Sequence, residues 1–287
     1  MDERTSKEFA IFAMCLVRNE ADIIAQCLRS AAVWSDAIFV YDNGSDDGTW
    51  EIVRELAQVV PGVIPFRQDT KPFSDSLRGE IFEHYRASCA EGDWWCRLDA
   101  DEFYIDNPRV FLKSVSWHSD VVWSASFQYY FTEKEAERYR LNPEAFANDV
   151  PVEDKCRHYR NDWSEPRFFR YHKSLNHNGF AWPRPLGSSN PARIRLKHFQ
   201  YRSPDQISRR LATRRDAMAV GMFRHEKVPD WSSQISARQP TVHGAVPGFF
   251  PSSWEERIVD SQVLNCDDET VTYVIEEHML PPIRQLA

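Results

Sequence analysis

The stretch that most constrains this chain runs from Asp93 to Phe103 and reads Asp-Trp-Trp-Cys-Arg-Leu-Asp-Ala-Asp-Glu-Phe. Its aromatic and apolar start favours a buried β-strand, and carboxylates follow directly at the carboxyl end of that strand. Ligands bind at this end of the strands in an open α/β sheet. Asp99 and Asp101 are two positions apart, so an extended backbone points both side chains the same way. Two like charges held together need a counter-charge, which predicts a Mg²⁺ or Mn²⁺ site with positions left for a diphosphate.

The chain before this stretch alternates between predicted strands and helices. Apolar runs predict strands at 9–17, 37–41 and 63–66. Apolar residues at helical spacing predict one helix capped by Asn19 and two more over 49–60 and 75–89. This alternation predicts an α/β fold with a mainly parallel sheet flanked by helices.

The order is looser after Phe103. We expect a short helix from Asn107-Pro108, and further elements alternate along the chain. They are a strand over 121–131, a helix over 133–146, strands over 167–172 and 193–199, and a helix over 203–220. Residues 222–287 show few clear elements.

Composition and charge exclude some classes of function. The six cysteines show no metal-binding spacing, and no apolar run approaches about 18 residues, so we expect a cytoplasmic protein without a transmembrane segment. The net charge is −8, yet residues 155–215 hold 15 Lys and Arg and three Asp and Glu, a local charge of +12. This imbalance argues against a nucleic-acid binder and favours a local anionic partner, which is a nucleotide diphosphate, a phosphorylated acceptor or an anionic membrane face.

A second acidic turn lies at the end of another predicted strand. Asp42 follows the strand over 37–41, and Gly44 and Gly48 allow close approach of the backbone to a ligand. In a doubly wound sheet, Asp42 and Asp99 face the same crevice. Two acidic sites at one sheet edge suit a nucleotide, one for the base or ribose and one for the metal and diphosphate.

Three motifs occur in order along the first hundred residues. They are Val-Arg-Asn-Glu at 17–20, Tyr-Asp-Asn-Gly-Ser-Asp-Asp-Gly-Thr at 41–49 and Leu-Asp-Ala-Asp-Glu-Phe at 98–103. Together they resemble family 2 glycosyltransferases with the GT-A fold, and the Asp-Ala-Asp-Glu-Phe ending resembles a bacterial branch of that family. The resemblance is best over residues 9–105. Further on, His-Asn-Gly at 177–179 and His-x-x-Tyr-Arg-Ser at 198–203 resemble motifs of related sequences.

The resemblance implies which residues bind the donor. Asp42 would hold the nucleotide base, and Arg18 and Glu20 would line the nucleotide pocket. Arg78 would meet the nucleotide or a phosphate from the helix before the central strand, with Arg86 as a rival.

The resemblance also implies a metal site. Asp99 would contact the ribose or the metal, and Asp101 would bind Mn²⁺ or Mg²⁺ directly. His198 is the further candidate ligand to the metal or the diphosphate, and a capping or core histidine is the alternative reading.

The catalytic base is less defined by the sequence. An inverting transferase needs a carboxylate that deprotonates the acceptor hydroxyl. Asp154, Asp162 and Glu165 are the candidates, with simple surface charge as the alternative. His177 is a candidate to bind the acceptor or a phosphate.

The function implied is an inverting, metal-dependent hexosyltransferase. It would move a sugar from a nucleotide-diphosphate sugar to a glycan or lipid-linked acceptor, anionic acceptors included, in surface polysaccharide or glycoconjugate synthesis. Peripheral contact with the inner face of the membrane is compatible with it. We expect residues 1–220 to form the GT-A domain, with a nucleotide-binding half over 9–105 and an acceptor half over 106–220. Residues 221–287 would form a C-terminal extension acting as an acceptor or lid segment.

Two other functions use similar residues. A haloacid-dehalogenase-like phosphatase also ends a strand in Asp-x-Asp and uses the first Asp as nucleophile, but that motif would open the fold, whereas β-α units precede it here. The other alternative is a non-catalytic GT-A-like protein that binds a glycan or a partner, and the intact acidic motif argues against it.

Overall fold

The computed structural model describes residues 9–71, 73–219 and 251–284. The chain divides into two compact units. The first unit comprises Met1–Ser126, Asn161–Lys197 and Ile275–Ala287, and the second comprises Phe127–Arg160 and His198–Val274. The predicted domain boundary at residue 220 adjoins a segment, 220–250, that lies outside the described residues, as does the start of the predicted C-terminal extension. That division therefore stays a prediction.

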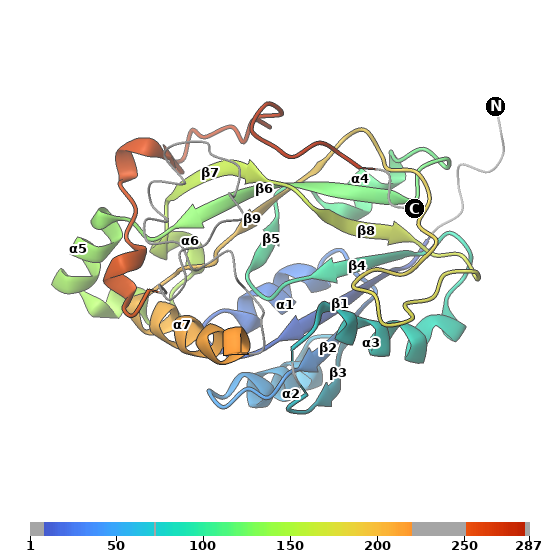
Figure 1. The fold of residues 1–287 in the computed structure, drawn as a ribbon, viewed down its shortest axis with the longest axis horizontal. Coiled ribbons are helices and arrows are strands. Elements are labelled where there is room, and N and C mark those ends of the chain that lie inside the picture. The colour runs from blue at the N-terminus through green and yellow to red at the C-terminus, as the bar shows by residue number, and fades with distance from the viewer. Residues whose placement is uncertain (1–8, 72, 220–250, 285–287) are drawn as a thin grey trace. The chain divides into compact units, whose positions relative to one another are not determined.

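The first unit is built on a mixed sheet with the strand order β6-β8-β4-β1-β2-β3 (Figure 1). The pairs β1–β2, β2–β3 and β1–β4 are parallel, and β8 pairs antiparallel with both β4 and β6. Beside this order, β5 pairs with β9. The bounds are β1 Ile11–Val17, β2 Ala37–Asp42, β3 Val63–Gln68, β4 Trp94–Leu98, β5 Glu102–Tyr104, β6 Val121–Tyr130, β8 Pro166–Arg170 and β9 Ile194–His198.

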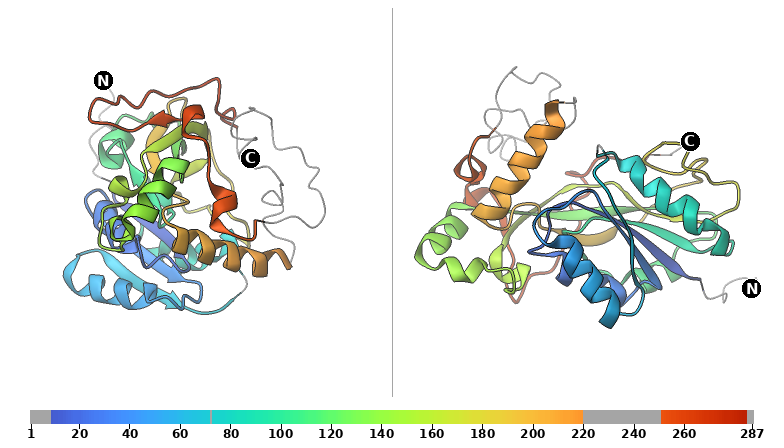
Figure 2. Two further views of the ribbon diagram at one scale, coloured as in Figure 1. Left: turned by 90° about the vertical axis from the view of Figure 1, so that its left-hand side faces the viewer. Right: turned by 90° about the horizontal axis from the view of Figure 1, so that it is seen from below.

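Helices cover both faces of the parallel strands, because apolar side chains project from both faces of the sheet. On one face, Ala13 and Cys15 of β1 pack with apolar residues of α1 (Ile24–Ala32) and α2 (Thr49–Val59). On the other face, Met14 and Leu16 pack with α3 (Arg78–Tyr85). Figure 2 shows the blue helix and the teal helix α3 on opposite sides of the blue strands. The predicted α/β fold with helices flanking a mainly parallel sheet is confirmed.

Short helical turns extend α3 at both ends. Asp75–Leu77 precedes it and Arg86–Ser88 follows it, so the predicted helix over 75–89 is confirmed. The helix α4 (Pro108–Lys113) begins after Asn107, whose side-chain oxygen accepts a hydrogen bond from Val110 N at 3.3 Å.

The predicted cap at Asn19 is wrong. The helix α1 begins at Ile24 and has no side-chain cap. Asn19 has a φ of 57°, and its side-chain oxygen accepts a hydrogen bond from the backbone N–H of Asp46 at 3.0 Å instead. Asparagine tolerates this left-handed conformation better than most residues. Asn19 therefore joins two loops rather than starting a helix.

The second unit combines helices with short strands. Its sheet order is β10-β7-β6, and β10 pairs antiparallel with β7. The sequence pattern did not predict β7, α6 or β10. The bounds are α5 Glu133–Leu141, α6 Val152–Lys155, β7 His158–Trp163, α7 Pro204–Ala219 and β10 Asn265–Cys266, with 3-10 turns at Pro143–Phe146, Trp254–Arg257 and Ser261–Val263.

Two local features stabilise the second unit. Thr132 and Glu135 form a capping box at the start of α5, and Glu135 Oε1 also lies 2.9 Å from Nδ1 of buried His158. Phe127 and Tyr129 pack against Tyr159 with ring centroids 5.6 and 5.5 Å apart. Within the described part of the chain, no helix is both long enough and apolar enough to cross a membrane.

Candidate functional site

Two loops at the carboxyl ends of β1 and β2 are joined by hydrogen bonds. The backbone N–H of Asn19 donates to Ser45 Oγ, and that of Glu20 donates to Thr49 Oγ1, both at 2.9 Å. The Asn19–Asp46 bond adds a third link. The structure therefore brings the predicted donor residues Arg18 and Glu20 to the loop that follows Asp42.

Asp42 ends β2 and is fully buried. Its Oδ1 accepts a hydrogen bond from the N–H of Ser45 at 2.7 Å. Oδ2 has no hydrogen-bond partner among the described residues. The Gln68 amide is still near enough to lower the pKa of Asp42. Burial raises the pKa of Asp42, and the amides of Ser45 and Gly44 oppose the rise. Oδ2 is thus a polar atom at the sheet edge that another group can satisfy.

Gly44 is required in this loop. Its φ is 78°, and an added Cβ would lie 3.0 Å from Cγ2 of Thr70. A residue with a side chain would be strained here both by conformation and by contact.

The acidic residues after β4 lie in a tight turn. The backbone N–H of Glu102 donates to the carbonyl of Asp99 at 3.2 Å, and β5 begins at Glu102. The expectation that Asp99 and Asp101 lie in one extended segment is therefore wrong. The turn leaves Asp101 and Glu102 buried, while the Asp99 side chain is one quarter exposed.

Two buried arginines hold Asp99. Arg78 Nη2 donates to Oδ1, and Arg167 Nη1 donates to Oδ2 at 2.9 Å. Arg78 also donates to Asp75 Oδ1 at 2.8 Å. Arg86 instead contacts Glu83 and the carbonyl of Lys173. Of the two rival arginines, Arg78 is the one that contacts Asp99.

Arg167 connects three carboxylates. Besides Asp99, its Nη2 donates to Glu102 Oε1 and to Glu165 Oε1, the latter at 2.7 Å. Ligand oxygens of Asp99, Glu102 and Glu165 lie within 4.8 Å of one another, an arrangement that also suits a cation. The guanidinium of Arg167, which has no exposed surface, pairs with all three. The carboxylates are thus arranged around an arginine.

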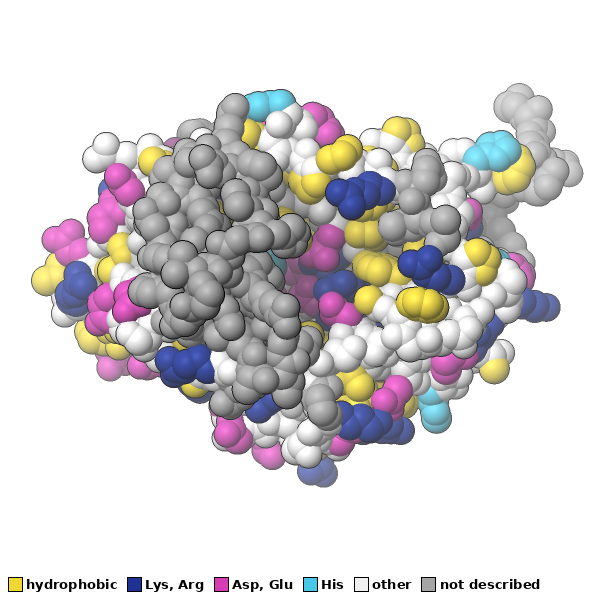
Figure 3. All heavy atoms as spheres, viewed as in Figure 1, with side chains coloured by type: hydrophobic (Ala, Val, Ile, Leu, Met, Phe, Trp, Pro, Cys, Tyr) yellow, Lys and Arg dark blue, Asp and Glu magenta, His cyan; other side chains and the backbone are white. Residues whose placement is uncertain are grey.

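Arg97 completes this network from β4. Its Nη2 lies 3.0 Å from Asp75 Oδ1, and its Nη1 lies 3.7 Å from Glu165 Oε2. Burial raises the pKa of Glu165, but the charges of Arg167 and Arg97 outweigh burial and lower the pKa below its usual range. Glu165 is therefore a carboxylate at neutral pH. We call this set, Asp75, Arg78, Arg97, Asp99, Glu102, Glu165 and Arg167, the arginine–carboxylate network. Figure 3 shows acidic and basic side chains of this mixed kind gathered in a hollow of one face.

A known protein family matches the sequence of this chain. The family described as glycosyl transferase family 2 matches residues 15–183, which is more than half of the chain. The chain belongs to glycosyl transferase family 2. The match includes every member of the arginine–carboxylate network and the loops around Asp42. The family resemblance drawn from the three sequence motifs is confirmed, and so is the predicted enzyme class at the level of the family.

One solved structure similar to this chain is described as the crystal structure of GalNAc-T7 with UDP, GalNAc and Mn²⁺. Its TM-score is 0.39 and its sequence identity is 11%. The alignment covers 91% of this chain and 56% of that one, so the chain spans about half the length of that protein. No curated protein matches the chain.

His177 of this family 2 member is buried against α3. Its side chain packs on Gly79, where an added Cβ would lie 2.8 Å from Cβ of His177, and its ring centroid is 5.2 Å from that of Phe82. Nδ1 lies 3.1 Å from the carbonyl of Phe180, and burial lowers the pKa of the ring. His177 is 2% exposed and supports the helix that carries Arg78. Its predicted role as an acceptor or phosphate ligand stays a prediction.

The other candidates are divided between the two units. Glu165 and Asp162 belong to the first unit, as Asp99 and Asp101 do, whereas Asp154 and His198 belong to the second. Asp154 is exposed on α6. The structure places Glu165 in the network around Asp99. The metal role of His198 stays a prediction.

Sequence reasoning did not single out Arg97, Arg167 or Glu102. A signal for Arg167 exists, because a charged residue stands in the apolar strand β8, two positions after Glu165 and on the same face. Arg97 likewise stands in an apolar strand, β4, two positions before Asp99. Buried arginines of this kind require carboxylate partners.

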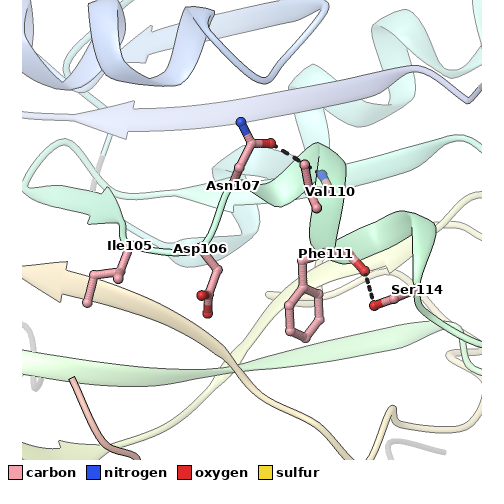
Figure 4. Close-up of a pocket in the computed structure, with 6 residues that line it drawn as sticks. All are labelled: Ile105, Asp106, Asn107, Val110, Phe111 and Ser114. Atoms are coloured by element: carbon pink, nitrogen blue, oxygen red, sulfur yellow. Dashed lines mark hydrogen bonds between the residues drawn. The ribbon is translucent and has the colours of Figure 1, made fainter. Parts of the chain in front are cut away.

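A separate hollow of about 450 Å³ lies beside α4. Figure 4 shows its lining from the chain after β5 and from the helix, with Phe111 and Asp106 directed into it. None of the predicted site residues lines it, and the Asp106 carboxylate is paired with Arg195 at 2.6 Å. Its chemistry does not match a nucleotide site.

Proposed function

We propose that this protein transfers a sugar from a nucleotide-diphosphate sugar to a hydroxyl group of a glycan or lipid-linked acceptor, with inversion, in surface polysaccharide or glycoconjugate synthesis. Membership of glycosyl transferase family 2 supports the reaction class. The observation that carries the proposal is that Arg167 joins Asp99, at the carboxyl end of β4, to Glu165. A donor-side acid and a candidate base are thereby held in one network. Cytoplasmic location and peripheral membrane contact stay predictions.

The donor nucleotide would bind at the carboxyl ends of β1, β2 and β4. Asp42 would hold the base through Oδ2, and the linked loops would place Arg18 and Glu20 along the nucleotide. Arg78 fixes Asp99 in position for the ribose. These assignments follow the family resemblance, and the geometry of the loops supports them.

A divalent cation fits the donor set on the grounds of charge. The arginine–carboxylate network contains four carboxylates and three guanidiniums, and Asp101 in the same turn adds a fifth carboxylate. These eight residues carry a formal charge of −2, which matches one Mn²⁺ or Mg²⁺ with hard oxygen ligands. As the family resemblance implies, Asp101 would hold the ion and Asp99 would contact it, although Asp99, like Glu102 and Glu165, is also paired with Arg167. The ion, when bound, would stabilise the charge of the leaving diphosphate.

Glu165 is the base that the geometry favours. It is ionised at neutral pH, it is held by Arg97 and Arg167, and its side chain is 22% exposed, so an acceptor hydroxyl can reach it. In the transfer step, Glu165 takes the proton of the acceptor hydroxyl while the oxygen attacks the sugar carbon and the nucleotide diphosphate leaves.

A thermal-shift screen tests the donor assignment. Nucleotide sugars are added with and without Mn²⁺, and we expect one donor to raise the melting temperature more when Mn²⁺ is present, because binding stabilises the folded state. Mn²⁺-dependent hydrolysis of the same donor then separates an enzyme from a protein that binds glycans without catalysis. If no nucleotide sugar raises the melting temperature, the proposed function is wrong. Activity on an aryl phosphate would instead support the phosphatase alternative.

A further inference from the structure

Trp163 presents an exposed aromatic ring at the end of β7, in the part of that strand from residue 161 on that belongs to the first unit. Half of its surface is exposed, although tryptophan is large and apolar. Its indole Nε1 donates a hydrogen bond to Glu165 Oε1 at 3.1 Å. Because this bond fixes one edge of the ring, the exposed face is held in a defined orientation.

The carboxylate that Trp163 contacts is itself fixed. Glu165 Oε1 also accepts from Arg167, and Glu165 Oε2 lies 3.7 Å from Arg97 Nη1. The exposed ring therefore stands beside a carboxylate that cannot turn away without breaking several contacts. An aromatic face and a reachable hydrogen-bond acceptor lie next to each other on the first unit.

A second indole lies on the Arg97 side of the same carboxylate. The guanidinium carbon of Arg97 is 5.7 Å from the ring centre of Trp182, which is partly exposed. The ring of Trp182 also packs edge-on against Phe169 with centroids 6.1 Å apart. The order of contacts is thus Trp163, Glu165, Arg97 and Trp182, with an aromatic ring at each end of an ion pair.

Exposure alone does not explain this arrangement. Trp117 is 67% exposed, and its ring lies against that of the neighbouring His118 with centroids 3.4 Å apart. Single exposed aromatic residues of that kind are common on protein surfaces. Trp163 differs because its N–H, at the edge of the ring, donates to Glu165 of the arginine–carboxylate network, which leaves the face of the ring exposed beside that carboxylate.

We propose that Trp163, Glu165 and Trp182 form an acceptor subsite that binds a pyranose ring, with an apolar C–H face of the sugar on Trp163 and a sugar hydroxyl on Glu165. This inference rests on the proposed function, in which Glu165 receives the acceptor proton. Aromatic rings with a few placed polar groups are the usual lining of small-ligand sites. The charge of Glu165 disfavours a phosphate in contact with it, so the group at this subsite is a neutral sugar ring.

Fluorine NMR of protein labelled with 5-fluorotryptophan tests the subsite directly. The chain has ten tryptophans, and the Trp163→Phe and Trp117→Phe variants assign the two relevant signals. The probes are methyl β-glucopyranoside and methyl β-galactopyranoside, with sorbitol as a polyol that lacks a ring. We expect one of the glycosides to shift the Trp163 signal saturably while the Trp117 signal stays in place and sorbitol has no effect. The proposal is overturned if the Trp163 signal does not move up to about 0.1 M glycoside, which detects binding in the tens of millimolar range, or if both signals move alike.

Transfer kinetics give a second test with the glycoside that shifts the signal. Trp163→Ala should raise the KM of that acceptor about tenfold, more than it raises the KM of the donor, because a stacked aromatic contact is lost. Trp163→Phe keeps a ring and should restore most of the acceptor affinity. Trp117→Ala is the matched control and should behave as the wild type. Equal acceptor KM values for Trp163→Ala and wild type would overturn the subsite. If the wild type does not hydrolyse any donor, the proposed function is wrong, and the NMR result alone decides the subsite.

Discussion

Clustered arginines have different partners in the two units. In the first unit, Arg78 and Arg167 each contact at least two carboxylates. In the second unit, Arg210, Arg214 and Arg257 surround the phenol of Tyr201, and two of their guanidinium carbons lie 5.6 and 5.5 Å from its ring centre. The first arrangement has an acidic excess, whereas the second sets three guanidiniums around one phenol, with the charge of Glu256 near Arg257. A cation and an anion are therefore expected on different units.

The basic stretch over 155–215 is divided by this difference. Its part in the first unit has a net charge of +5 and its part in the second unit +7. In the first unit, Arg170 and Arg195 pair with Asp120 and Asp106 at 3.7 and 2.6 Å. This agrees with a basic face paired to acids of the first half of the chain. An anionic acceptor group is better sought on the second unit.

The Arg167→Met substitution should have the largest effect, and it should lower the free energy of unfolding. Removing the guanidinium leaves Asp99, Glu102 and Glu165 close together without their common partner. The loss should be about 3–5 kcal/mol in the free energy of unfolding, as for a broken buried ion pair. Urea unfolding followed by circular dichroism measures it.

Arg195→Met is the control for that experiment. The Arg195–Asp106 pair is one third exposed on the arginine side, so its loss should cost about 1 kcal/mol or less. If Arg167→Met costs no more than Arg195→Met, the network does not stabilise the first unit.

The donor half of the fold was predictable because its signals are local. Each strand there is an apolar run followed at once by polar residues, and Gly44 and Gly48 mark the turn after β2. The arginine–carboxylate network was not predictable in this way. Arg167 meets Glu102 and Asp99 across 65 and 68 positions, and nothing in a single sequence gives that pairing. The tight turn at Asp99 was missed because the two-residue spacing of Asp99 and Asp101 was read as that of an extended backbone, whereas β4 ends at Leu98.

A second prediction tests the acidic excess of the first unit. Asp101→Ala should lower the Mn²⁺-dependent affinity for the donor diphosphate about 10- to 100-fold, while the folded protein is retained. Asp42→Asn should instead weaken binding of the nucleoside monophosphate even with a chelator present, because Asp42 would contact the nucleoside in the proposed site. Calorimetry with and without Mn²⁺ measures both.

Asp106→Ala is the matched control, since Asp106 pairs with Arg195 outside the network. An unchanged Mn²⁺ dependence in Asp101→Ala would remove Asp101 from the metal site. An unchanged monophosphate affinity in Asp42→Asn would remove Asp42 from the nucleotide site.

A third prediction tests the basic cluster of the second unit. Burial raises the pKa of Tyr201, but Arg257, Arg214 and Arg210 outweigh burial and lower it to about 8. The ordinary value is 10, so the folded protein releases this proton before the unfolded chain does. Stability from this group therefore rises with pH between about 8 and 10, by about 1–2 kcal/mol, and is lost as the pH falls through 8.

Urea unfolding at a series of pH values measures that slope, and Tyr201→Phe removes the titrating group while keeping the ring. The difference between wild type and variant should grow from pH 7 to pH 10. A constant difference would show that the arginines do not act on Tyr201. The ultraviolet absorbance of the phenolate reports the same titration directly.

The smallest expected effect concerns exposed charge on the second unit. Arg209 and Arg184 are both exposed arginines of the basic stretch, but Arg209 lies on α7 in the second unit and Arg184 in the first. Arg202 is unsuitable for this test because it is fully buried and its Nη1 donates to the carbonyl of Phe199. If the second unit attracts an anionic acceptor, Arg209→Glu should raise the KM of a phosphate-bearing acceptor about twofold at 0.1 M salt and hardly at all at 1 M, because the screening length falls from about 10 Å to about 3 Å. Arg184→Glu should leave both values near those of the wild type. If the acceptor KM of both variants changes with salt in the same way, the basic charge of the whole molecule acts on the acceptor. The difference in charge between the two units would then not contribute to acceptor binding.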